Sequence, residues 1–200
     1  MISATESLAR LRQGNQRFVE GVPVGFTSQD RPLPSAKSQE PFAVILGCSD
    51  SRVPTEIIFD QGPGDLFVIR VAGNIVAPSQ IASVEFATEY LGARLVVVLG
   101  HAQCGAVTAT LKEMETPGAI NMPNLKAITD HITPALVNDD RCMNLKDEQA
   151  RLARAISINV DTSMAALKDG SSLIAEGHAQ GRFLVVGAEY SLETGVVRFR

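Results

Sequence analysis

Two stretches of this 200-residue chain decide its fold: FAVILGCSDSR at residues 42–52 and LVVVLGHAQCG at residues 95–105. Each begins with a short, continuous run of mostly aliphatic residues that ends in glycine. Runs of this kind are typical of strands that are covered on both faces of a parallel sheet. We therefore expect a buried strand in each stretch, with a cysteine-containing motif directly after its carboxyl end.

Similar apolar runs and helical patterns alternate through the rest of the chain, which is typical of βαβ units around a parallel sheet. A further buried strand is expected at 66–71, and the runs RFLVVGAEY and GVVRF flank residues 191–194, a hairpin-length link between two last strands. Helices are expected at 79–91, 106–114, 125–137 and 147–168. The sequence therefore predicts an α/β fold, with a mostly parallel central sheet that has an antiparallel edge strand and is flanked by helices.

The first 41 residues differ in composition from the rest. Ser3 and Glu6 have the spacing of a capping box, and apolar residues then recur at helical spacing, which predicts an amphipathic helix. Residues 21–41 are rich in Pro, Gly, Ser and Gln, which is typical of an extended arm. We expect a single domain over 1–200, with this helix and arm at 1–41 and an α/β core at 42–200.

Composition excludes several classes of function. A formal net charge of -4 without any Lys/Arg run disfavours partners such as nucleic acid or an anionic membrane. We expect a cytoplasmic protein, because the chain has no signal-peptide pattern and no apolar stretch of about 18 residues. The three cysteines are odd in number and far apart, so they are predicted to be thiols.

Cys48, His101 and Cys104 are candidate metal ligands. In open parallel sheets ligands bind outside the carboxyl ends of the strands, so these side chains share one crevice if their strands are neighbours. Each alone is more often a buried core residue, but two thiolates and one imidazole together form a donor set that suits Zn²⁺. Three ligands leave a fourth position open, as in catalytic zinc sites. Cys142 has no second ligand nearby and is predicted to be a bystander.

Asp50 and Arg52 follow Cys48 closely enough to form a bidentate pair beside the metal. A three-ligand zinc lowers the pKa of its bound water to about 7, so the expected nucleophile is zinc-bound hydroxide. These residues leave the substrate open among carbon dioxide, an ester or an amide, whereas the absent deaminase signature disfavours a nucleobase. His131 and His178 cannot be placed near the metal, so the proton shuttle stays unassigned.

The motifs CSDSRVPTE and GHAQCGA, within a likeness that runs from LRQGNQRF to VVGAEYSLETGVVRF, resemble the β-class carbonic anhydrases. The resemblance implies one zinc per chain on Cys48, His101 and Cys104, and reversible hydration of carbon dioxide to bicarbonate. It also implies that Asp50 and Arg52 form the dyad that controls access to the metal.

The plant-like members of this family line their substrate pocket with residues that match Gln39 and Phe67 here, and Ala72 is expected in the same wall. A third pocket residue, an aromatic from the partner subunit, falls on Phe86, where the family pattern has Tyr. A second, bicarbonate-regulated subgroup carries Trp at the position of Ile45. Since this chain contains no Trp, the resemblance implies the plant-like subgroup without cooperative shut-off by bicarbonate.

Members of the family are dimers or higher assemblies with active sites at subunit interfaces, so we expect a homodimer or homotetramer. The first helix and the arm have no obvious place in the core and are expected to embrace the partner. Three alternatives stay open: a hydrolase of carbon disulfide or carbonyl sulfide, a non-catalytic zinc-binding homologue, and a thiol redox protein. The last is disfavoured because the chain has no C-x-x-C motif.

Overall fold

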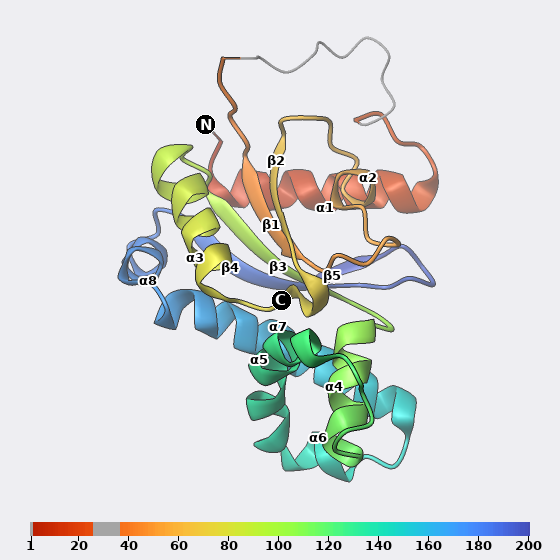
Figure 1. Ribbon diagram of the computed structural model, residues 1–200. Coiled ribbons are helices and arrows are strands. Elements are labelled where there is room, and N and C mark those ends of the chain that lie inside the picture. Colours follow the sequence, from red (N-terminus) through yellow and green to blue (C-terminus); the bar gives the residue numbers. More distant parts are fainter. Residues whose placement is uncertain (1, 26–36) are drawn as a thin grey trace.

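A computed structural model of the chain describes residues 2–25 and 37–200. Its centre is one five-stranded sheet in the order β2-β1-β3-β4-β5 (Figure 1). The strands are β1 (Ala43–Gly47), β2 (Leu66–Arg70), β3 (Leu95–His101), β4 (Leu184–Tyr190) and β5 (Val197–Phe199). Neighbours among the first four strands are parallel, whereas β5 pairs antiparallel to β4. The predicted fold class is therefore confirmed.

The two strands that carry the cysteine motifs lie side by side at the middle of the sheet. In their register Val44 pairs with Val96 and Gly47 with Leu99, and every residue of both strands is buried. Because the strands are parallel, their carboxyl ends meet at the same edge of the sheet. The condition for a shared crevice is thus fulfilled.

The strand at Leu66–Arg70 differs from its prediction. The sequence predicts cover on both faces, but within residues 2–25 and 37–200 β2 pairs with β1 alone, and most of its residues are only half buried. An edge strand has no neighbour on its outer side, so an apolar run by itself does not tell an edge strand from a central one.

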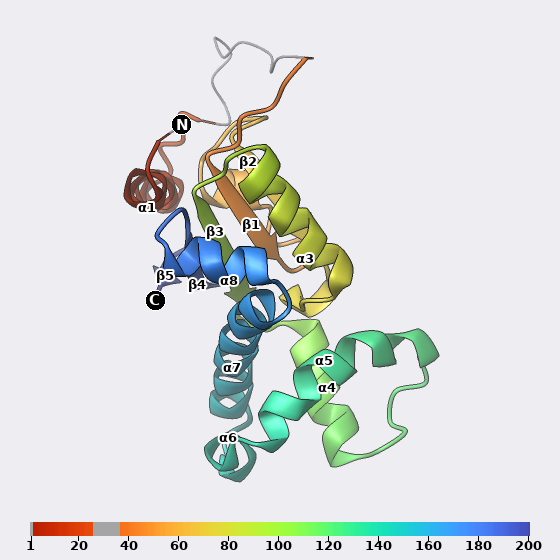
Figure 2. The ribbon, with the colours of Figure 1, turned by 90° about the vertical axis from the view of Figure 1, so that its left-hand side faces the viewer.

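Helices cover both faces of the sheet, and a separate helical lobe extends beyond the carboxyl ends of the strands. Figures 1 and 2 show α1 on one face and α3 and α8 on the other, with α7 leading into the lobe of α4, α5 and α6. The helices are α1 (Ala4–Glu20), α2 (Thr55–Ile58), α3 (Pro78–Glu85), α4 (Gly105–Glu115), α5 (Lys126–Val137), α6 (Asp140–Asn144), α7 (Glu148–Asp169) and α8 (Ser172–Ala179), with short turns η1 (Ala72–Asn74), η2 (Phe86–Tyr90) and η3 (Pro123–Leu125).

Three of the predicted helices are confirmed as α4, α5 and α7. The predicted helix at 79–91 divides into α3 and the π-helical turn η2. Helices α2, α6 and α8 were not predicted from the sequence. They are at most eight residues long, which is too short for apolar residues to recur clearly at helical spacing.

The N-terminal helix begins as predicted. The Glu6 amide donates to the Ser3 hydroxyl (3.2 Å), while the Ser3 amide donates to the Glu6 carboxylate (2.8 Å), which completes the capping box. The expectation that this helix lacks a place in the core is wrong, because Leu11 is fully buried among the residues of one sheet face. Much of the predicted arm, residues 26–36, lies outside the described residues.

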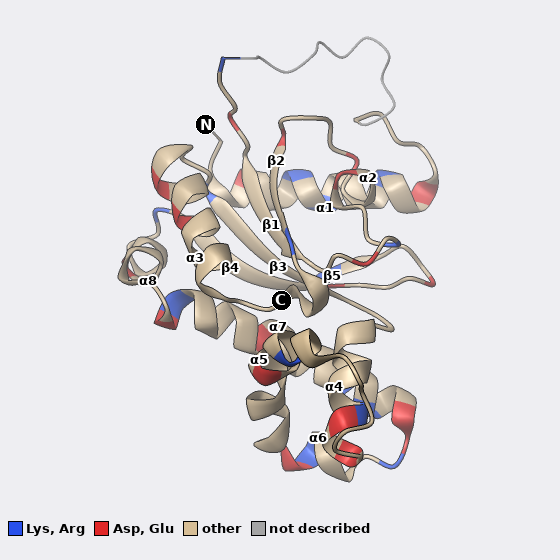
Figure 3. Cartoon of the chain, in the orientation of Figure 1, with Lys and Arg blue, Asp and Glu red and all other residues tan. Residues whose placement is uncertain are grey.

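Charged residues of both signs are interspersed along the described part of the chain. Figure 3 shows the strands almost free of them, and Lys/Arg and Asp/Glu interspersed over the lobe. Among the described residues, no helix combines the length and the apolar character that crossing a membrane requires.

Candidate metal centre

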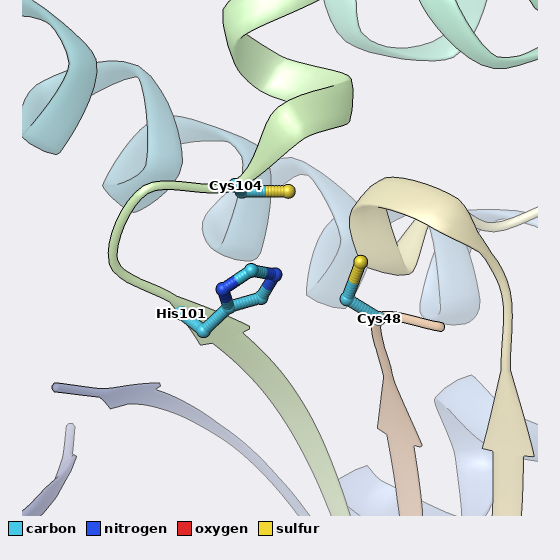
Figure 4. Close-up of side chains that lie close together, drawn as sticks. All are labelled: Cys48, His101 and Cys104. Atoms are coloured by element: carbon cyan, nitrogen blue, oxygen red, sulfur yellow. The ribbon is translucent and has the colours of Figure 1, made fainter. Parts of the chain in front are cut away.

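Three donor side chains converge at the carboxyl ends of the two central strands. Cys48 directly follows β1, His101 is the last residue of β3, and Cys104 directly precedes α4. Their ligand atoms all lie within 4.8 Å of one another, and all three side chains are buried. In Figure 4 they point toward a common position from three segments. Residues 53 positions apart in sequence thus form one cluster because the parallel register aligns their strand ends.

The imidazole of His101 presents one nitrogen to this position. Its Nδ1 lies 2.8 Å from the Ala102 carbonyl and therefore carries the proton that it donates. Its Nε2 is buried and has no hydrogen-bond partner among the described residues. A metal-ligating histidine has this arrangement, because the bond at the other nitrogen fixes the ring and its tautomer.

The two thiols share one proton. The hydrogen bond with Cys104 lowers the pKa of Cys48 to about 4, and the same bond, with burial, raises the pKa of Cys104. One sulfur is then a thiolate and the other a thiol. Two sulfurs and an unpartnered nitrogen at this separation fit a tetrahedral cation with one further position, and soft donors favour zinc over magnesium or calcium.

Asp50 and Arg52 form the predicted pair beside this cluster. The Asp50 carboxylate accepts from Nε (2.9 Å), Nη2 (2.7 Å) and the backbone N–H (2.9 Å) of Arg52. These bonds lower the pKa of Asp50, so that it stays ionised at neutral pH. Its Oδ2 also lies 3.9 Å from His101 Nε2. The carboxylate therefore lies beside the position that a metal would occupy, and the arginine holds it there.

Three further hydrogen bonds come from the end of β2 and the turn η1, and the sequence analysis predicted none of them. The side chain of Arg70 donates to the carbonyls of Cys48 and Asp50, and the Gly73 amide donates to Cys48 Sγ (3.3 Å). Gly73 has φ +71°, a conformation that favours glycine. The Ala-Gly-Asn turn after an apolar run was the only available signal for this contact.

The predicted pocket residues lie in two places. Ala72 belongs to η1, next to the contact of Gly73 with Cys48, and is half buried. Gln39 precedes the amino end of β1, and Phe67 lies in the amino half of β2, where it contacts Phe86 (ring centroids 6.2 Å apart). Because β1 alone spans about 13 Å, these three residues do not reach the cluster of their own chain.

Other residues with reactive side chains lie apart from the cluster. The buried thiol of Cys142 faces the carbonyl of Arg151 (3.7 Å). His131 Nδ1 is 2.9 Å from the Ala127 carbonyl on α5, and His178 Nδ1 accepts from the Val185 amide (3.4 Å). Each of these groups has a local structural partner.

Comparison with known proteins agrees with this geometry. Residues 43–197 match the family described as carbonic anhydrase. The chain belongs to the carbonic anhydrase family. A carbonic anhydrase of Mycolicibacterium smegmatis is 38% identical over 192 residues, which cover 95% of this chain and 90% of the relative.

Solved structures place the chain in the β class of this family. The β-carbonic anhydrase CcaA superposes with a TM-score of 0.76 at 29% identity, covering 97% of this chain and 87% of that one. A tetrameric β-carbonic anhydrase of Sordaria macrospora superposes with a TM-score of 0.74 at 28% identity, covering 82% of each chain. The resemblance stated from the two cysteine motifs is therefore confirmed.

Proposed function

We propose that this carbonic anhydrase catalyses the reversible hydration of carbon dioxide with one zinc ion per chain, held by Cys48, His101 and Cys104. The observation that carries the proposal is the buried three-donor cluster, which leaves one position free beside a restrained carboxylate. Curated relatives that bear the name carbonic anhydrase favour carbon dioxide over carbon disulfide or carbonyl sulfide.

The zinc ligands, Arg52 and Asp50 have different roles in the proposed site. A zinc ion with three protein ligands supplies a water whose pKa is lowered to about 7, and hence a nucleophile at neutral pH. Arg52 keeps both oxygens of Asp50 occupied, which prevents this carboxylate from filling the fourth position. Asp50 in turn is ionised and would accept a hydrogen bond from a hydroxyl group bound there. The pair therefore keeps the site open and orients the group that reacts.

The substrate pocket is completed by a second copy of the chain in this proposal. Phe86 and Tyr90 are 44% and 80% exposed, and their rings stack with centroids 5.2 Å apart. With Phe67 behind them they form an apolar patch at the edge of the sheet, which suits burial against a partner. Gln39 and Phe67, which do not reach their own cluster, would line the site of the partner. We therefore propose that the protein is a homodimer or a homotetramer.

Two further parts of the proposal concern regulation and location. Ile45 lies fully buried within β1, where the bicarbonate-regulated subgroup has Trp, and Asp50 is already paired with Arg52. We therefore expect activity without a cooperative loss caused by bicarbonate. The free cysteines suit a reducing compartment, so a cytoplasmic location is included in the proposal.

Stopped-flow hydration of carbon dioxide by the zinc-loaded protein tests the proposed function. We expect fast hydration between neutral pH and about pH 9, its loss in Cys48→Ala, and its retention in the matched control Cys142→Ala. A protein that binds zinc but hydrates no carbon dioxide at any pH would overturn the proposal. Assays with carbon disulfide and carbonyl sulfide would then decide whether another substrate takes its place.

A further inference from the structure

Arg70 makes a contact with the active-site loop that the function proposed above does not use. It is the last residue of β2, and its guanidinium reaches across to the loop that follows β1. Nε donates to the carbonyl of Cys48 (3.0 Å), and Nη2 donates to the carbonyl of Asp50 (2.6 Å). One side chain thus binds the backbone of a metal-ligand candidate and of the dyad carboxylate at once.

The backbone of the same strand end binds this loop as well. The amide of Val71 donates to the Gly47 carbonyl (3.1 Å), and the amide of Gly73 donates to Cys48 Sγ (3.3 Å). Gly73 is itself fixed from the other side, because Asn159 on α7 donates to its carbonyl (2.7 Å). The loop therefore rests on a rigid support, to which Arg70 contributes hydrogen bonds from its side chain.

The orientation of the Asp50 peptide matters because its side chain has two possible partners. The carboxylate is bound by Arg52, yet its Oδ2 is only 3.9 Å from His101 Nε2, at the edge of the metal position. Arg52 binds both oxygens of the carboxylate, but its own side chain is 53% exposed, so the orientation of the Asp50 backbone also decides where the carboxylate lies. A rotation of the Asp50 peptide toward His101 would bring the carboxylate closer to the position of a bound metal.

We propose that Arg70 is a positioning residue, which holds the backbone of Cys48 and Asp50 so that the Asp50 carboxylate stays on Arg52 and off the metal. Arg70 does this through the carbonyls of Cys48 and Asp50. The inference rests on the metal site proposed above. It assigns the open state of that site to three arginine-mediated links: Arg70 to the loop, Arg52 to Asp50, and Arg52 to the Gln103 carbonyl (3.3 Å).

The test compares Arg70→Met, which removes the donors at similar length, with Arg70→Lys, which keeps the charge but loses the planar fork. Arg94→Met is the matched control, because Arg94 also donates to a backbone carbonyl, that of Arg182 (3.0 Å), at the opposite end of β3. Two measurements are made on each variant: the pH profile of kcat/KM for carbon dioxide hydration, and the pH dependence of the visible absorption of the cobalt(II)-substituted protein.

In Arg70→Met we expect the midpoint of both pH profiles to rise by about one pH unit. This corresponds to a tenfold change in the ratio of Asp50 bound to Arg52 to Asp50 bound to the metal. Arg70→Lys should shift less, and Arg94→Met should match the wild type. An unchanged midpoint in Arg70→Met, or a uniform loss of activity without a shift, would overturn the inference. If Arg70→Met does not fold, an unshifted Arg70→Lys overturns it equally.

The cobalt spectrum keeps this test separate from that of the proposed function. It reports the position of Asp50 even in a protein that hydrates no carbon dioxide. Absent hydration with a shifted cobalt profile would contradict the substrate and support the role of Arg70. Normal hydration with an unshifted cobalt profile would support the substrate and contradict the role of Arg70.

Discussion

At the scale of single residues, the chemistry of the site depends on how one proton is shared. Cys48 and Cys104 are buried side by side, and their hydrogen bond makes the former the thiolate and the latter the thiol. His101 presents a bare Nε2, because its Nδ1 proton is donated to the Ala102 carbonyl. A divalent cation has to replace only the proton of Cys104, since metals bind cysteine as thiolate.

This proton balance predicts how zinc binding depends on pH. Titration calorimetry of the metal-free protein at about pH 6, where a zinc-bound water of pKa about 7 keeps its proton, in buffers of different ionisation enthalpy, should show release of about one proton per zinc. Affinity should rise about tenfold per pH unit, because the pKa of Cys104 is raised and its deprotonation becomes easier at higher pH. Cys104→Ser should release less than one proton and Cys142→Ser should behave as the wild type. Release of two protons would contradict the shared-proton arrangement.

At the scale of elements, α1 is attached to the core by close backbone approach and by one buried amide. A Cβ built at Gly14 would lie 1.8 Å from the carbonyl oxygen of Phe59, directly after α2. The adjacent Asn15 donates to the carbonyls of Ile58 (3.1 Å) and Gly195 (2.8 Å) and accepts from the Val197 amide (2.8 Å). The helix therefore joins α2 to the edge strand β5, although both are far from it in sequence.

Gly14→Ala should destabilise the protein despite the better helix propensity of alanine. Propensity favours the substitution by about 1 kcal/mol, while overpacking against a fixed backbone costs about 3 kcal/mol, so we expect a net loss of about 2 kcal/mol in the free energy of unfolding. Urea unfolding measures it, with the exposed Gln13→Ala on the same helix as control. Equal stability of the two variants would show that α1 shifts without cost.

At the scale of the whole molecule, the patch of Phe67, Phe86 and Tyr90 leaves apolar surface without cover in one chain. A second copy that covers this patch would bring Gln39 and the aromatic residues to the other subunit's site. Assembly and catalysis would then be coupled, because neither pocket would be complete in an isolated chain.

Phe86→Glu should therefore dissociate the assembly and abolish most of the hydration activity together. A charge buried at an apolar interface without a partner is strongly unfavourable. Sedimentation velocity checks the mass, and Val137→Glu, which alters an exposed apolar residue on α5, is the control. Phe86→Glu with the mass and the activity of the wild type would exclude this patch from the interface.

The sequence by itself determined the strands, the longer helices and the candidate donors. An apolar run, a capping box and a cysteine after a strand are local features, and local periodicity and chemistry are sufficient to recognise them. Ser3 with Glu6, and Cys48 with His101 and Cys104, were identified in this way.

Only the tertiary structure decided which features meet. The edge position of β2, the burial of Leu11 and the contact of Arg70 with the Cys48–Asp50 loop depend on strand order and on backbone register, which join residues far apart in sequence. The same register separates Gln39 and Phe67 from the cluster, because opposite ends of one sheet cannot meet within a single chain. Pairing of distant backbone groups has no local signature, and it is this pairing that turns three donors and two arginines into one site.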